Sequence, residues 1–255
     1  KLTAASGRAG HFISATAGAI AVASGFFILS FYSVVAGWAL HYLAIALQLA
    51  GTHPDGAAAT FEALAGDRET SALWHSMFMV MVVGVVAGGV QQGIERTCKV
   101  LMPALLVILL GLLAYVAAAG GLDASAAFLF QPDFSKITAD AVLEALGHAF
   151  FTLSLGMGAM MTYGSYLDTD AHLVRDQFAI AFLDTAIAVL SGLVIFAVVF
   201  AMGAAPGAGP GLVFITLPGL FAEIPGGPVV AIAFFALLIL AAWSSGISLL
   251  EVVVA

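Results

Sequence analysis

The chain has 255 residues, of which 62% are hydrophobic and only 9% are charged, and its mean hydropathy is +1.12. Soluble domains carry about 25% charged residues, so this composition excludes a water-soluble fold. The net charge of −8 comes without a basic patch, which excludes nucleic-acid binding, and the single cysteine, Cys98, excludes an internal disulfide and a cysteine-rich metal site.

Charged residues gather in short clumps and leave six long uncharged runs between them. A helix of about 20 residues crosses the roughly 30 Å hydrocarbon core of a bilayer, and a helix satisfies its own backbone groups in lipid. The sequence therefore predicts an all-α membrane protein with a single transmembrane domain over residues 1–255. The expected helices are 12–49, 72–90, 100–120, 147–167 with a break near 154–158, 177–203 and 228–255.

The first expected helix is long for one crossing. Two crossings with a turn at Ser24 and Gly25 would fit, but no Pro, Asn or Asp marks a reversal, so one tilted helix is preferred. If the amino end lies inside, five of the seven Lys and Arg residues are cytoplasmic and only Arg68 and Lys136 lie outside. No signal-peptide pattern opens the chain, and its last residues continue a helix pattern. We therefore expect both ends to be cut from a longer protein.

Two glycines and a serine lie at the centre of the fourth span, in the stretch Ser154-Leu-Gly-Met-Gly158. Each glycine weakens a helix by about 1 kcal/mol. Interrupted spans form the binding sites of many transporters, because unwound backbone exposes carbonyls and helix ends to ions and substrate. The residues alone leave a second interpretation open, in which the glycines serve close helix packing.

Asp184 is the only acid deep within a span. A carboxylate at that depth costs about 2.5 to 3.5 kcal/mol, so an ion ligand is the favoured interpretation and a protonated structural Asp is the alternative. Ser244 and Ser245 in the last span offer hydroxyls that suit a hard monovalent cation, although membrane serines more often bond to the preceding helical turn. The Tyr32 hydroxyl requires a partner inside the bundle, and Ile28 lies on the same helix face.

A catalytic role is not supported. His148 and Ser154 lie six residues apart on different helix faces, and no G-x-S-x-G motif is present, so an intramembrane hydrolase is disfavoured. The remaining histidines are scattered and offer no metal-binding spacing. The sequence therefore predicts a protein that is not an enzyme.

Several stretches, in order along the chain, resemble the neurotransmitter:sodium symporter family, in its bacterial amino-acid transporter branch. The stretch 150–158, Phe-Phe-Thr-Leu-Ser-Leu-Gly-Met-Gly, is similar to the sixth-helix signature. Similar stretches elsewhere are 32–38 for the third helix, 93–103 for the fourth-to-fifth loop, and 128–136 and 214–218 for two outer loops. The resemblance implies a fragment holding six transmembrane helices, three to eight, of the inverted-repeat leucine-transporter fold.

The resemblance also implies site residues, position by position. Thr152 and Asp184, where the family often has Asn, would bind a first sodium ion. The Ala241 carbonyl and the hydroxyls of Ser244 and Ser245 would bind a second. Tyr32 and Phe151 would form the outer gate. Tyr166 would belong to the inner gate. The implied amino-acid pocket consists of Ile28, Tyr32, Phe151, Thr152, Ser154, Met157, Ser245 and Leu249.

The function implied is sodium-coupled symport of an amino acid across the bacterial inner membrane by alternating access, with sodium and no organic cofactor. Met157, a flexible side chain at the position that sets pocket size, predicts a hydrophobic substrate. Chloride is not expected, because Ala188 stands where chloride-dependent relatives have Ser and Asp184 carries a charge of its own. The alternatives are a non-transporting amino-acid sensor on the same fold and a proton-coupled carrier. The expected partners are the amino acid and the bilayer, and the oligomeric state is left open.

Overall fold

The computed structural model describes residues 8–49, 56–167, 172–207 and 209–255, and all regular structure in these ranges is helical. The α-helices are α1 (Arg8–Leu49), α2 (Ala57–Gly66), α3 (Arg68–Val86), α4 (Arg96–Ala118), α5 (Leu122–Phe130), α6 (Ala139–Thr152), α7 (Ala159–Tyr166), α8 (Leu173–Ala201), α9 (Gly209–Gly211), α10 (Leu217–Phe221) and α11 (Gly227–Val254). Two π-helices, η2 (Gly89–Glu95) and η4 (Leu212–Thr216), and a 3₁₀ helix, η3 (Phe134–Lys136), lie between them.

Five helical stretches of the described residues are long and apolar enough to cross a membrane: α1, α3, η2 with α4, α8 and α11. Helix α1 runs without interruption through Ser24 and Gly25. The other expected span, 147–167, is divided into α6 and α7 by a non-helical stretch at 153–158. The fold is therefore the all-α membrane fold that the sequence predicts.

Several helices extend into segments expected to be connections. Helix α6 begins at Ala139 because Thr138 caps it: the Thr138 hydroxyl accepts a hydrogen bond from the Ala141 N–H at 3.2 Å. The expected connection 91–99 is helical as well, and Glu95 pairs with Lys99 one turn later at 2.6 Å on its exposed surface. Acids and bases end a membrane span without ending the helix.

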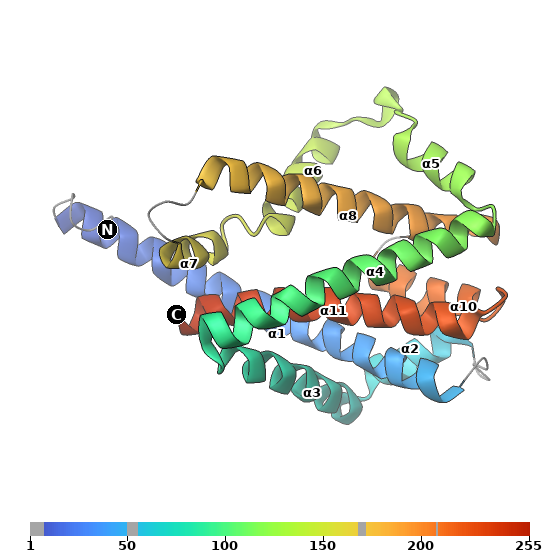
Figure 1. The fold of residues 1–255 in the computed structure, drawn as a ribbon, viewed down its shortest axis with the longest axis horizontal. Coiled ribbons are helices and arrows are strands. Elements are labelled where there is room, and N and C mark those ends of the chain that lie inside the picture. The colour runs from blue at the N-terminus through green and yellow to red at the C-terminus, as the bar shows by residue number, and fades with distance from the viewer. Residues whose placement is uncertain (1–7, 50–55, 168–171, 208) are drawn as a thin grey trace.

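Helices α1 and α11 lie side by side along most of their lengths, with α3 against α1 and α4 against α11 (Figure 1). Helix α8 packs against α4 and α5. Both ends of the drawn chain lie on one side of the molecule, and α2 and α10 lie at the opposite end (Figure 1). The break between α6 and α7 lies beside α1 and the last turn of α11, because the nearest neighbours of Gly158 are Ala21 and Val252.

Glycine allows a close crossing between α1 and α3. A Cβ atom added at Gly37 would lie 2.7 Å from the backbone nitrogen of His75, which no real side chain tolerates. Small residues at helix crossings in lipid let backbones approach and gain dispersion energy. Next to this crossing, Phe78 and Val82 of α3 are fully buried and lie against Gly246 of α11, so α1, α3 and α11 pack closely together.

Candidate substrate and ion site

The break in the fourth expected span is built by three residues in left-handed conformation. The φ angles are 55° at Ser154, 85° at Gly156 and 84° at Gly158. Glycine adopts such angles freely, whereas Ser154 does so at a cost of about 1 kcal/mol or more. Gly158 also requires the lack of a side chain, because a Cβ there would lie 2.8 Å from the Cβ of Ala21 on α1. The glycines are thus needed for the break and its close contact with α1.

Across this break, the last residue of α6 contacts α8. The Thr152 hydroxyl donates to both carboxylate oxygens of Asp184, at 3.0 Å and 3.1 Å. Asp184 is half-buried and Thr152 is exposed. Carboxylate and hydroxyl oxygens are the ligands that hard cations prefer. The structure therefore brings together the two residues expected at the first sodium site.

A second group of oxygens lies on α11. The hydroxyls of Ser244 and Ser245 both donate to the Ala241 carbonyl, at 2.8 Å and 3.2 Å. This bonding to the preceding turn is the structural alternative considered for membrane serines. It also gathers three oxygens on one helical turn. Each hydroxyl that donates its proton keeps free lone pairs on its oxygen, and these lone pairs can coordinate a cation.

The apolar residues expected in the amino-acid pocket gather around Met157. Met157 and Leu249 are buried in contact with Leu29 of α1, and Ile28 and Tyr32 pack against this cluster. The Tyr32 hydroxyl lies near the Ser245 hydroxyl on α11. These contacts form an apolar floor beside a hydroxyl pair, an arrangement that can receive an apolar side chain and a polar head group.

Two expected pocket residues lie apart from this cluster. The Phe151 side chain is 52% exposed, and among the described residues no ring contact joins it to Tyr32. Ser154 lies within the break, half-buried. The two residues expected to form the outer gate, Tyr32 and Phe151, thus make no ring contact with each other among the described residues.

A buried acid that the sequence interpretation did not use lies at the other end of the site. Glu251 is only 6% exposed, and its carboxylate accepts a 2.6 Å hydrogen bond from the hydroxyl of Tyr166, the expected inner-gate residue. One turn away, the Tyr163 hydroxyl donates to Ser248 at 3.1 Å. The available signal was spacing, because Glu251 follows Ser244 by seven residues and so lies on the same face of α11.

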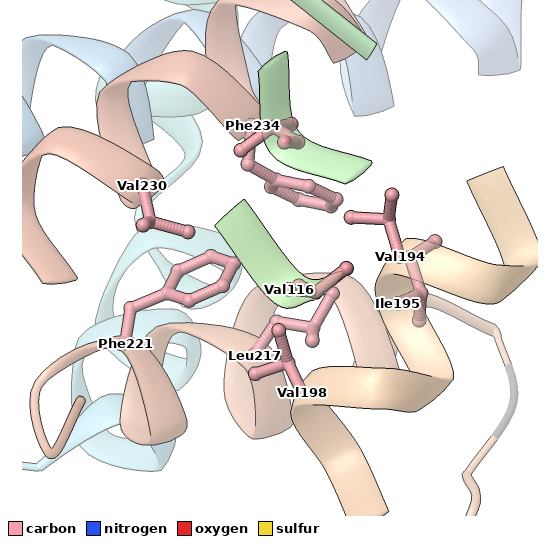
Figure 2. Close-up of a pocket in the computed structure, with 9 residues that line it drawn as sticks. Val116, Val194, Ile195, Val198, Leu217, Phe221, Val230 and Phe234 are labelled. Atoms are coloured by element: carbon pink, nitrogen blue, oxygen red, sulfur yellow. The ribbon is translucent and has the colours of Figure 1, made fainter. Parts of the chain in front are cut away.

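The small cavity in Figure 2 is not part of this site. It lies between α4, α8, α10 and α11, and its lining is entirely apolar, with Val116, Val198 and Phe221 pointing into it (Figure 2). Only about 10 Å³ of it can hold the centre of a water-sized sphere, and no polar group faces it. A site for water or ions needs polar partners, so this cavity is a packing void.

Known proteins resemble the chain over most of its length. The family profile described as the sodium:neurotransmitter symporter family matches residues 67–255. An uncharacterized sodium-dependent transporter of Bacillus subtilis, YhdH, is 37% identical over 240 residues, covering 93% of this chain and 53% of the relative. An uncharacterized sodium-dependent transporter of Haemophilus influenzae is 35% identical, covering 90% and 51%.

A solved structure also resembles the chain over most of its length. The crystal structure of MhsT in complex with L-phenylalanine is 48% identical in sequence and matches with a TM-score of 0.84, covering 93% of this chain and 54% of that one. The chain thus spans about half the length of the relatives it matches.

Proposed function

We propose that this chain, which belongs to the sodium:neurotransmitter symporter family, forms half of a sodium-coupled amino-acid symporter. The members of this family are secondary transporters and not enzymes. The observation that carries the proposal is the contact between Thr152 and Asp184 across the broken span. It joins a residue at the break to an acid within the membrane-length helix α8.

Sodium is the ion that the Thr152 and Asp184 oxygens are suited to bind. An unpaired carboxylate at membrane depth is costly, and a bound monovalent cation would offset that cost while hydroxyl and carbonyl oxygens complete its shell. A cation held there would link the end of α6 to α8. The second group of oxygens, Ala241, Ser244 and Ser245, is proposed for a further sodium ion on the same grounds.

A hydrophobic amino acid is the substrate class that the floor favours. Met157 and Leu249 are buried and present only apolar atoms, and a thioether adapts to side chains of different size. The hydroxyl pair of Tyr32 and Ser245 lies beside the floor, where a carboxylate could accept a hydrogen bond. The bound L-phenylalanine named for MhsT is consistent with this class.

Coupling is proposed to follow alternating access at a bacterial inner membrane. Sodium and amino acid together would favour a closed state, and the sodium gradient would drive release inside. Asp184, already anionic beside the first sodium position, would make chloride unnecessary.

The test is flux by the full-length protein in lipid vesicles. An inward sodium gradient should drive accumulation of labelled phenylalanine or leucine above equilibrium, and replacing sodium with choline should abolish it. Accumulation in sodium-free buffer under a pH gradient would instead indicate a proton-coupled carrier. Sodium-dependent binding without any accumulation would indicate a sensor, and either result would overturn the proposal.

A further inference from the structure

A tyrosine at the far end of α1 bonds to a carbonyl of the π-helix η4. The Tyr42 hydroxyl donates to the Phe214 carbonyl at 2.8 Å, and both side chains are only 1% exposed. Tyr42 also packs against Phe214 and Phe235, with ring centroids 5.3 Å and 5.2 Å apart. The bond is therefore sealed from solvent on the described side of the molecule.

The Phe214 carbonyl needs this donor because of a proline. In an α-helix the carbonyl of residue 214 accepts from the N–H of residue 218, but Pro218 has none. The chain responds by widening into the π-helix, in which the Leu217 N–H bonds to the Leu212 carbonyl, five residues back. A buried carbonyl without a partner is costly. The buried Tyr42 hydroxyl supplies a donor to the carbonyl whose α-helical donor Pro218 removes.

The position of this bond gives it a role beyond packing. Helix α1 also carries Tyr32, ten residues earlier and hence about 15 Å along the helix. The η4 and α10 segment, residues 212–221, lies at the end of the bundle opposite the chain ends (Figure 1). A second tyrosine bonds beyond it, because the Tyr115 hydroxyl of α4 donates to the Pro225 carbonyl at 2.6 Å at an exposed position.

We propose that Tyr42 is a positioning residue, which latches the segment 212–221 to α1 by supplying the hydrogen-bond donor that Pro218 cannot give to the Phe214 carbonyl. Through this latch the segment moves as one body with the helix that carries Tyr32. The consequence for transport rests on the proposed function, whereas the latch itself does not.

The latch is tested by hydrogen–deuterium exchange of residues 212–221 in the full-length protein, comparing wild type, Tyr42→Phe and Tyr115→Phe. Tyr42→Phe keeps every ring contact and removes only the hydroxyl. It should speed exchange in this segment about tenfold, the effect of about 1.4 kcal/mol on local opening. The control Tyr115→Phe also removes one tyrosine hydroxyl, but that hydroxyl bonds to Pro225, outside the segment. It should therefore leave the exchange rates of residues 212–221 unchanged.

The rescue variant is specific to this mechanism. Pro218→Ala restores an N–H at position 218, so in the Tyr42→Phe background it should return exchange toward the wild-type rate. Unchanged exchange in Tyr42→Phe, or equal acceleration with and without Pro218→Ala, would overturn the latch.

Uptake assays on the same preparations test the positioning role. Tyr42→Phe should lower the maximal rate of sodium-driven uptake with substrate KM unchanged, because the hydroxyl does not contact the pocket. If Tyr42→Phe speeds exchange in residues 212–221 but takes up substrate at the wild-type rate, the positioning role is refuted. If wild type itself shows no uptake, the proposed function fails while the exchange result still decides the latch.

Discussion

Removing the Thr152 hydroxyl should weaken sodium binding without removing the acid. In Thr152→Val the side chain keeps its shape, but the hydrogen bond that the hydroxyl shares between the two Asp184 carboxylate oxygens, at 3.0 Å and 3.1 Å, is lost. A hydrogen bond to a charged group contributes about 1.5 to 3 kcal/mol. Thr152 is exposed in the described chain, so the lower value applies, which corresponds to about a tenfold change in an equilibrium constant.

The assay is a sodium titration of amino-acid uptake by the full-length protein in vesicles. The half-saturating sodium concentration should rise about tenfold in Thr152→Val. The matched control is Thr185→Val, because Thr185 is the next residue after Asp184 and its hydroxyl bonds only to the Ala181 carbonyl at 2.8 Å. A sodium dependence equal to wild type in Thr152→Val, or an equal shift in Thr185→Val, would refute the assignment of this site.

Three further outcomes are expected. Met157→Phe should weaken uptake of the bulkiest amino acids most, because Met157 is 7% exposed at the pocket floor; equal loss for small and large substrates would contradict this pocket. Replacing chloride with gluconate should leave wild-type uptake unchanged, and Asp184→Asn with Ala188→Ser should create a chloride requirement; a requirement in wild type would contradict the charge argument. Val198→Ile should fill the cavity of Figure 2 and raise the free energy of unfolding in detergent by up to about 0.8 kcal/mol. Val199→Ile, at a fully buried position that does not line the cavity, should lower the free energy of unfolding.

Hydropathy and glycine content predicted the main features of the fold, because a lipid-crossing helix must be apolar along its whole length. Short helices outside the spans escaped this criterion. Helix α2 has no long apolar run, and its entry turn requires Gly56 at a φ of 83°. Helix α6 begins eight residues before the expected start of its span, where Asp140 and Glu144 end the apolar run but continue the helix. Charge sets the limits of membrane crossing, and capping sets the limits of helices.

The site was predictable as a set of residues, but not as a set of contacts. Asp184 could be singled out by its depth alone, whereas its bond to Thr152 depends on how α6 and α8 cross. Glu251 was missed because it lies near the end of the last expected span, 228–255, where an acid resembles an interfacial one. Only the fold shows that it is buried and bonded to Tyr166.

The two halves of the broken span are held by different helices. On one side of the break, Thr152 bonds to Asp184 of α8. On the other side, Tyr163 and Tyr166 bond to Ser248 and Glu251, both on α11. The residues between, 153–158, form no helix, and their left-handed angles occur mainly at glycine, which changes conformation at low cost. Each half of the span is therefore bonded to a different helix, and the non-helical residues lie between the two attachments. Thr152 and Asp184, the proposed ligands of the first sodium ion, form the connection on the α8 side, so sodium binding there would act directly at one edge of the break.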